Sequence, residues 1–310
     1  MTLNGRKMPG RSSAVWRSRI ITFKSLALAP IGKLAQLPCV CSGTCGSNPC
    51  IIERLLTHRY LPKGAAHLRA LILSDIHANL EALRAVIDDA SSRGGFDVLW
   101  CLGDLVGYGP DPVPCLTLVR SHSFVAVAGN HDYASVGKMS VDAFNYAAKA
   151  AANWTTSQLS QSEVDFLSGL PLVANHEPFT MVHGSLRDPL EEYLLDADAA
   201  EASLKLLATR FLLVGHSHFP FLCLENESTP QFVEFTEDAV LPLTEQRWII
   251  NPRSTGQPRD RDPRSSYAIY DDQDATIERH RVEYDIEGTQ SKMQEAHLPE
   301  YLIERLKFGI

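Results

Sequence analysis

The sequence predicts an α/β fold, and three observations support this prediction. Apolar runs alternate with helical patterns between residues 68 and 128, short strand patterns crowd residues 172–284, and 45% of all residues are hydrophobic. A β-α-β-α-β order favours a largely parallel sheet with helices on its faces. Because residues 68–310 contain neither an internal repeat nor a linker, we expect one domain over residues 67–310.

The first half supplies the parallel sheet and its helices. Apolar runs predict three strands, an amphipathic pattern predicts the first helix, and Pro112 opens a second helix. In chain order these are a strand from Arg69 to Ser74, a helix from Leu80 to Ser92, a strand from Asp97 to Leu102, a helix from Pro112 to Arg120 and a strand from Phe124 to Ala128. Helical segments follow over residues 141–158 and 160–167, and Pro171 ends that region.

The second half is rich in strands. Short apolar runs bounded by turn residues predict strands over residues 172–174, 180–182, 211–214, 219–224, 231–235, 247–250, 266–270 and 276–284. One helix is expected among them, over residues 199–208, and a last helix over residues 299–308.

Residues 1–66 differ in kind from the rest. They contain ten Lys or Arg and a single acid, Glu53, for a formal charge of +9, whereas residues 67–310 carry −17. No helix or strand period is sustained there, so we expect a basic extension outside the fold, either an unstructured tail or an organellar transit peptide. Four cysteines (Cys39, Cys41, Cys45 and Cys50) offer zinc ligands, although their spacing matches no paired Cys-x-x-Cys pattern.

Composition excludes several classes of protein. No apolar run approaches the ~20 residues that span a bilayer, and the net charge of −8 argues against a dedicated nucleic-acid binder. Cys101, Cys115 and Cys223 are scattered among apolar neighbours, which is typical of reduced thiols and favours a cytoplasmic protein.

Polar residues follow each apolar run at the point where a strand should end. Asp75 and His77 lie two residues apart after the first strand, and side chains at i and i+2 of an extended chain point the same way. The motifs Gly103-Asp104, Gly129-Asn130-His131-Asp132, His183-Gly184 and Gly215-His216-Ser217-His218 follow later runs. Since ligands gather at the carboxyl ends of strands in open α/β sheets, we expect these side chains to converge. Imidazole, carboxylate and amide groups together suit Mn, Fe or Zn.

The ordered set Asp-x-His, Gly-Asp, Gly-Asn-His-Asp, His and Gly-His-x-His resembles the calcineurin-like metallophosphoesterase superfamily over residues 68–284. The resemblance implies a four-layer α/β/β/α sandwich and a two-metal hydrolase. It also implies that Asp75, His77, Asp104 and His218 hold one metal, that Asp104, Asn130, His183 and His216 hold the other, and that Asp104 bridges them.

The same resemblance implies a catalytic role for His131, which would donate a proton to the leaving oxygen or hydrogen-bond a phosphoryl oxygen, with Asp132 orienting its ring. Relatives that serve as interaction subunits lack this histidine. Its presence at His131 therefore favours an enzyme.

Two loops resemble a subgroup of smaller bacterial-type phosphoesterases, residues 103–112 and 251–260. The second usually reads Asn-Pro-Gly-Ser, and here Arg253 replaces the glycine, at a cost of about 1–2 kcal/mol if the backbone keeps φ > 0. We expect Arg253 either to contact a substrate phosphate, as Asn130 would, or to be a solvated surface residue. Tyr108 is expected to stack on a substrate group at the pocket mouth, with core packing or simple exposure as the alternatives.

The sequence thus predicts a binuclear phosphoesterase acting on a small phosphoester or nucleotide-type substrate through a hydroxide activated by two divalent metals, with Mn first and Fe, Zn, Ni or Co as alternatives. A phosphodiesterase is favoured over a protein phosphatase on the subgroup resemblance. The alternatives are a dinucleoside polyphosphate hydrolase and a metal-stabilised interaction module without turnover.

Overall fold

The structure, a computed structural model, describes residues 67–310. The expected basic extension and its cysteine cluster at Cys39–Cys50 lie outside the described residues. The described residues belong to one compact unit. Within residues 67–310, no helix is long and apolar enough to cross a membrane.

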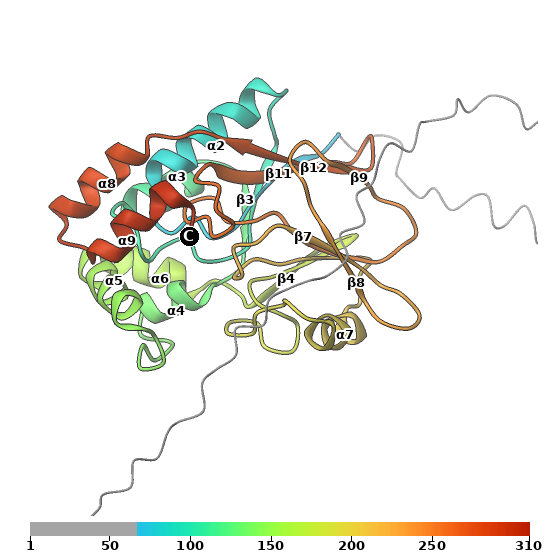
Figure 1. Cartoon of the computed structure of the whole chain (residues 1–310), viewed down its shortest axis with the longest axis horizontal. Helices are drawn as coiled ribbons and strands as arrows, with labels where there is room; N and C mark the ends of the chain where they lie inside the picture. Colours follow the sequence, from blue (N-terminus) through green and yellow to red (C-terminus); the bar gives the residue numbers. More distant parts are fainter. Residues whose placement is uncertain (1–66) are drawn as a thin grey trace, which may run out of the picture. The chain divides into compact units, whose positions relative to one another are not determined.

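Two six-stranded mixed sheets form the centre of the fold (Figure 1). The first has the order β3-β2-β1-β11-β12-β9 and the second β4-β5-β6-β10-β7-β8. In chain order the strands are β1 (Arg69–Leu73), β2 (Val98–Cys101), β3 (Phe124–Ala126), β4 (Val173–His176), β5 (Phe179–Val182), β6 (Phe211–Leu213), β7 (Phe221–Leu224), β8 (Gln231–Glu234), β9 (Val240–Pro242), β10 (Trp248–Asn251), β11 (Ser265–Asp271) and β12 (Thr276–Val282).

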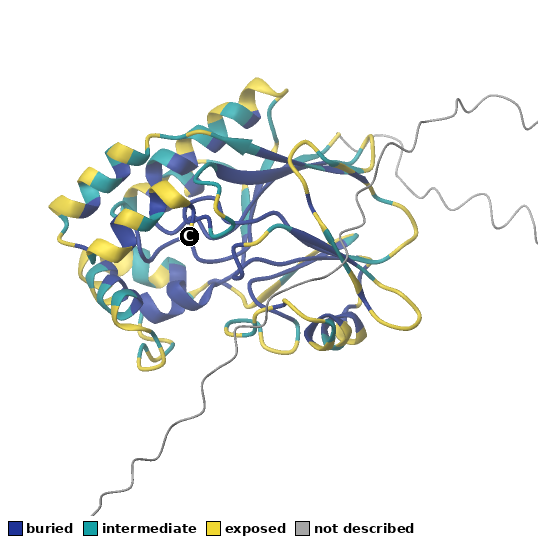
Figure 2. Cartoon of the chain, viewed as in Figure 1, coloured by how far each residue is buried: buried dark blue, intermediate teal, exposed yellow. Residues whose placement is uncertain are grey.

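Helices cover the outer face of each sheet. They are α2 (Leu80–Ser92), α3 (Pro112–Arg120), α4 (Asn130–Ser135), α5 (Tyr146–Gln158), α6 (Gln161–Ser168), α7 (Ala197–Leu206), α8 (Ile286–Glu295), α9 (Glu300–Glu304) and the 3₁₀ helix η1 (Arg305–Phe308). Helix α2 begins where Asn79 Oδ1 accepts a hydrogen bond from Ala82 N at 3.1 Å, and its apolar side faces the core (Figure 2).

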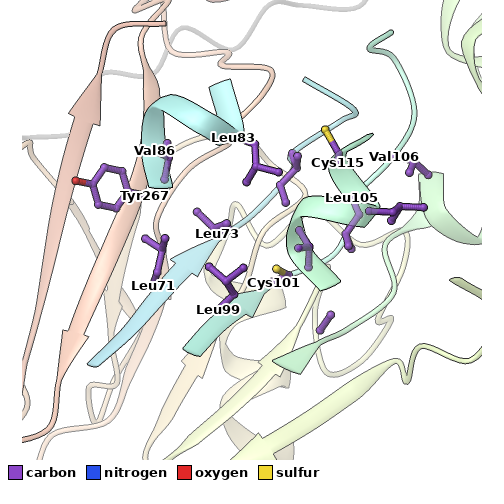
Figure 3. Packing of buried hydrophobic residues seen from close by; sticks show 14 of the residues in the cluster. Leu71, Leu73, Leu83, Val86, Leu99, Cys101, Leu105, Val106, Cys115 and Tyr267 are labelled. Atoms are coloured by element: carbon purple, nitrogen blue, oxygen red, sulfur yellow. The ribbon is translucent and has the colours of Figure 1, made fainter. Parts of the chain in front are cut away.

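The alternation of side chains along β1 produces two of the layers. Leu71 and Leu73 point toward α2 and α3, where they join one hydrophobic cluster (Figure 3). Ala70 and Ile72 point the other way and pack against residues of the second sheet, such as Phe179. A third cluster joins α7 to the outer face of the second sheet. The predicted four-layer α/β/β/α sandwich is therefore confirmed.

Strand register brings the functional loops together. β1, β2 and β3 are parallel, with Leu73 beside Cys101 and Cys101 beside Ala126, so the three strands end at one edge. In the second sheet β5, β6 and β10 are also parallel. The loops that follow these strands meet, because Thr255 N donates to Ser74 O at 2.8 Å and Gly215 N donates to His183 O at 2.8 Å.

The structure differs from the predicted elements in three places. The helix expected from residue 141 begins at Tyr146, because Asn145 Oδ1 caps it by accepting from Ala148 N at 3.0 Å. Helices α4 and α8 and strand β9 were not predicted, since they are short or mostly polar and their patterns are weak. The last helix is a short α9 continued by η1.

The C-terminal helices pack on the loop after β2. Met293 of α8, Leu302 of α9 and Leu306 of η1 share a hydrophobic cluster with Tyr108 and with Ala148 of α5. This segment therefore forms a wall beside the end of β2 and helps to bury Tyr108.

We expect a chain shortened to residues 67–310 to keep its fold and its activity, because the four hydrophobic clusters lie within those residues. Thermal denaturation should give a melting temperature within a few degrees of that of the full chain. Insoluble or inactive shortened protein would contradict the assignment of residues 1–66 to an extension.

Candidate metal centre

Seven side chains predicted as metal ligands converge where the parallel strands end. One group consists of Asp75, His77 and His218, and a second consists of Asp104, His183 and His216, with the ligand atoms of each group within 4.8 Å of one another. Asn130 joins the second group, since its Oδ1 lies 3.2 Å from His183 Nε2.

In the first group, three ligand atoms face a common point. His218 Nε2 lies 3.1 Å from Asp75 Oδ1 and 3.3 Å from His77 Nε2, while His77 Nε2 lies 3.8 Å from Asp75 Oδ1. In the second group His183 Nε2 lies 3.1 Å from His216 Nδ1. All of these side chains are buried.

Asp104 lies between the two groups. Its Oδ2 is 3.5 Å from His77 Nε2 in the first group and 3.3 Å from His183 Nε2 in the second. Its other oxygen, Oδ1, accepts from His131 N at 2.9 Å, which fixes the carboxylate plane. A single oxygen of Asp104 can therefore serve both groups.

Backbone carbonyls hold the far ring nitrogens of all four histidines in place. His77 Nδ1 lies 3.3 Å from Val106 O, His183 Nδ1 2.8 Å from Leu102 O, His218 Nδ1 2.5 Å from Gln257 O and His216 Nε2 3.3 Å from Glu191 O. A carbonyl accepts only, so each of these nitrogens carries the proton when the ring is neutral. The opposite nitrogens then direct lone pairs into the centre, as metal-bound histidines do.

The centre thus gathers many acceptors, and His183 is the one of its four histidines whose pKa is raised. Asp75 Oδ1 is buried and has no hydrogen-bond partner among the described residues. Burial lowers the pKa of His77 and His218, and it lowers the pKa of His216 to about 3, so these rings are neutral near pH 7. Burial also opposes protonation of His183, but the carboxylate of Asp104 outweighs it and raises the pKa of His183 to about 9. These imidazole nitrogens and carboxylate and amide oxygens fit two divalent cations that accept mixed N and O ligands.

The backbone of this centre corrects one part of the sequence argument. Strand β1 ends at Leu73, and Asp75 and His77 have φ of 52° and 48°, so they lie on a turn and not on an extended strand. Asp104, His216 and His218 also have left-handed φ, of 54°, 62° and 59°. Each such residue costs roughly 1–2 kcal/mol, and strain of this kind is concentrated at functional sites.

Two glycines leave room for side chains of the centre, Gly129 for the Asp104 carboxylate and Gly103 for the His183 ring. A Cβ on Gly129 would lie 2.0 Å from Asp104 Oδ1, and one on Gly103, whose φ is 87°, would lie 2.7 Å from His183 Nδ1. Gly129 is therefore required for space and Gly103 for both space and conformation.

His131 faces a cavity beside the metal centre. The cavity measures about 220 Å³ and its lining includes Asp104, Asn130, Tyr108 and His131. The ring of His131 is packed by Tyr108 at 4.2 Å and by Phe144 at 4.8 Å between centroids, and its Nδ1 has no hydrogen-bond partner among the described residues. Burial lowers the pKa of His131 to about 4. Tyr108 is 7% exposed, so it both lines the cavity and packs in the C-terminal cluster.

The structure corrects the expected role of Asp132. Its carboxylate does not contact the ring of His131; Oδ2 accepts from Gly129 N at 2.9 Å and Oδ1 from Val106 N at 3.1 Å. Burial and the Asp104 carboxylate raise the pKa of Asp132 to about 7. Asp132 is therefore the cap that starts α4, the helix carrying Asn130 and His131.

We expect Asp132→Ala to lower the free energy of unfolding by about 2 kcal/mol, because two buried N–H groups lose their acceptor. Urea denaturation would measure the change. The exposed Asp142, which pairs with Lys149 at the surface, provides a matched control, and Asp142→Ala should cost less than about 0.5 kcal/mol. Equal effects of the two substitutions would contradict the capping role.

The structure also corrects both expectations for Arg253. Its φ is 81°, so the glycine-like turn is retained, but its side chain is buried, neither solvated nor lining the cavity. The guanidinium donates to Asp260 and to the carbonyl oxygens of Arg264 and Asp262. Burial lowers the pKa of Arg253 to about 10. The internal hydrogen bonds replace the expected substrate contact and offset the strain of the turn.

Three more residues line the cavity: the sequence places Tyr193 in a segment, residues 191–195, expected at the rim and offers Arg259 as a contact for an anionic ligand, whereas Phe144 was not predicted. Phe144, Tyr193 and Arg259 line the cavity, and the Tyr193 ring stacks on metal-centre His216 at 4.0 Å between centroids with 12° between planes. Phe144 lies on a loop without a distinctive pattern. Arg259 lies in the loop that resembles the phosphoesterase subgroup, which was the one signal available for it.

Comparison with known proteins places this geometry in a family. A model described as the calcineurin-like phosphoesterase superfamily domain matches residues 68–275. An uncharacterized protein of Methanocaldococcus jannaschii is 38% identical over 243 residues, which cover 77% of this chain and 97% of that protein. A symmetrical bis(5'-nucleosyl)-tetraphosphatase of Vibrio campbellii is 27% identical over 186 residues, covering 58% of this chain and 64% of that protein.

A solved structure agrees with this result. The crystal structure of a metallophosphoesterase from Sphaerobacter thermophilus matches with a TM-score of 0.71 and 43% identity, covering 79% of this chain and 100% of that one. The match of the family model over most of the described residues, together with the order of the converging side chains, leads to one conclusion. The chain belongs to the calcineurin-like phosphoesterase superfamily.

Proposed function

We propose that this protein hydrolyses small phosphoesters with the help of two divalent metal ions. The observation that carries the proposal is the position of Asp104 Oδ2, which lies within 3.5 Å of a ligand nitrogen from each group. Asp75, His77, His218 and Asp104 would hold one ion, and Asp104, Asn130, His183 and His216 the other. Mn is the first candidate, with Fe, Zn, Ni and Co as alternatives, because mixed N and O ligands accept all of them.

When bound, two such cations supply charge that neutralises phosphoryl oxygens and lowers the pKa of a water molecule to make a nucleophile. The protein side chains position the metal ions and the substrate. Their rigid attachment to strand ends fixes the ligands, and the buried surroundings strengthen every charge interaction in the cavity.

His131 would contact the oxygen that leaves. Its ring lines the cavity next to Asn130, and its backbone N–H is tied to Asp104 Oδ1, so its position is coupled to the metal centre. The buried ring is neutral near pH 7 before substrate binds, since its pKa lies near 4. A bound phosphate would raise that pKa and allow His131 to donate a hydrogen bond or a proton.

The cavity volume favours a small substrate. About 220 Å³ is below the usual 300–1,000 Å³ of ligand pockets, which suits a phosphoester with one modest substituent better than an enclosed dinucleoside polyphosphate. A larger cavity of about 820 Å³ lies at the opposite, amino ends of β5 and β6, where its lining includes Pro178, Leu207 and Arg210 and none of the proposed ligands. The second candidate is a dinucleoside tetraphosphate hydrolase, on the similarity to the Vibrio campbellii enzyme.

Hydrolysis assays test the proposal. Metal-free protein should be inactive, and adding Mn²⁺ should restore turnover of bis-p-nitrophenyl phosphate, p-nitrophenyl phosphate or both. A parallel assay with bis(5'-adenosyl) tetraphosphate separates the second candidate, which predicts a much higher kcat/KM for that compound. Protein with two bound metals per chain and no turnover of any of the three would overturn the proposed hydrolysis and favour the interaction module.

A further inference from the structure

Arg259 stands out among the arginines near the metal centre. It lies in the loop between β10 and β11 and lines the same cavity as Asp104, His131 and His218. Its Cζ lies 6.0 Å from the centroid of the Tyr108 ring, and its Nη2 donates to Gln257 Oε1 at 3.0 Å.

Three arginines in or near this loop form ion pairs with carboxylates, and Arg259 does not. Arg253 pairs with Asp260, Arg281 pairs with Asp260 at 2.8 Å, and Arg264 pairs with Glu237 at 2.7 Å. Among residues 67–310, Arg259 forms no ion pair with an Asp or Glu, and its Nε is buried without a hydrogen-bond partner. The exposed Arg261 of the same loop is also without an ion pair among these residues, but of the two only Arg259 lines the cavity.

The guanidinium of Arg259 lies near a second arginine. Burial and, next to it, the charge of Arg259 lower the pKa of Arg305. The Arg259 guanidinium is partly removed from water, its Nε–H has no partner among the described residues, and Arg305 lies nearby. A bound anion would offset the free-energy cost of burying this charge. Its planar fork matches the oxygens of a phosphate.

We propose that Arg259 binds a non-bridging oxygen of the substrate's phosphoryl group from the side of the cavity lined by Tyr108 and His131. This inference rests on the proposed function, because it assumes that the phosphoryl group binds at the metal centre. The Tyr108 ring supports the guanidinium, and the C-terminal helices hold that ring in place. Arg259 is then a determinant of specificity, since it adds one charge to the site and favours a dianionic monoester over a monoanionic diester.

The test compares Arg259→Ala, Arg259→Lys and the control Arg261→Ala in the full chain loaded with two metals. Arg261 lies two residues away, is exposed and does not line the cavity. We expect Arg259→Ala to raise KM for p-nitrophenyl phosphate at least tenfold and KM for bis-p-nitrophenyl phosphate about threefold or less, with smaller changes in kcat. Arg259→Lys should recover part of the loss, and Arg261→Ala should match the wild type.

Binding of inorganic phosphate, measured by calorimetry, gives a readout that does not depend on turnover. The Kd of the metal-loaded protein for phosphate should rise at least tenfold in Arg259→Ala and remain unchanged in Arg261→Ala. Metal content and melting temperature are measured for every variant. Should Arg259→Ala fail to fold or lose metal, Arg259→Met, which keeps the stem of the side chain and lacks its charge, takes its place.

The outcomes separate the two proposals. One outcome is that the wild type turns over substrate while Arg259→Ala and Arg261→Ala share the same KM and the same Kd for phosphate. This outcome would overturn the role of Arg259 and leave the proposed function standing. Equal losses for monoester and diester would overturn the specificity for dianions. A wild-type protein that binds two metals and phosphate without turnover would overturn the proposed hydrolysis, while the phosphate measurements would still decide for or against Arg259.

Discussion

Replacing Asp104 with alanine should remove both metal ions from the protein and lower the rate of phosphoester hydrolysis by at least ~10³-fold. The reason is the position of Oδ2, which is the one ligand atom close to both groups, 3.5 Å from His77 Nε2 and 3.3 Å from His183 Nε2. Without this carboxylate, two cations in one buried site would repel each other with no shared negative charge between them. Elemental analysis after loading with Mn²⁺ and desalting would measure the metal content.

Two further variants make the Asp104 experiment specific. His77→Ala removes a ligand from the first group only, so it should leave close to one metal per chain. Asp238→Ala removes an exposed carboxylate from another cluster, near His280, and should leave two. Two metals per chain in Asp104→Ala would show that this residue is not the shared ligand.

His131→Ala should keep both metals and lower kcat by ~10²-fold or more, as expected for the loss of a general acid. His131 lines the cavity but belongs to neither group of ligands, so its removal leaves the metal-binding atoms unchanged. Metal analysis and steady-state kinetics on the same sample would measure both effects.

The leaving group provides a sharper test of His131. An acid helps most when the leaving oxygen is basic, so the loss in His131→Ala should be larger for an alkyl phosphoester than for a p-nitrophenyl ester. Phe144→Leu, which loosens the packing against the His131 ring without removing it, serves as a control and should show no such dependence. Equal losses for both leaving groups would assign His131 to phosphoryl binding alone.

The ligand set illustrates what could be predicted before the structure. Each of the motifs from Asp75 to His218 follows an apolar run, and parallel strands end at one edge, so convergence followed from pattern and topology. The four-layer sandwich and the family assignment agree with that prediction. The helices and strands with strong periodicity, such as α2 and α3, were also placed correctly.

The errors arose where a local pattern carries little information. Helix α8 is mostly polar and contains Gly288, and its place in the fold is set by packing against α2 and the C-terminal segment. The left-handed backbone of Asp75, His77 and Asp104 could not be read from an apparent strand, because tertiary hydrogen bonds such as Asp75 N to Gly103 O impose it.

The fold class, the candidate ligands and the strands that they follow could be predicted from the amino-acid sequence, because periodicity and residue type are local properties. Which charged side chains find a partner depends on tertiary contacts. In the folded protein Arg253 pairs with Asp260, and Asp132 accepts the hydrogen bond of Gly129 N that caps α4. Arg259 lies beside the candidate metal centre, and its Nε has no hydrogen-bond partner among the described residues. These partners come from segments that meet only after folding, and the cost of burying an unpaired charge makes their arrangement a property of the whole core.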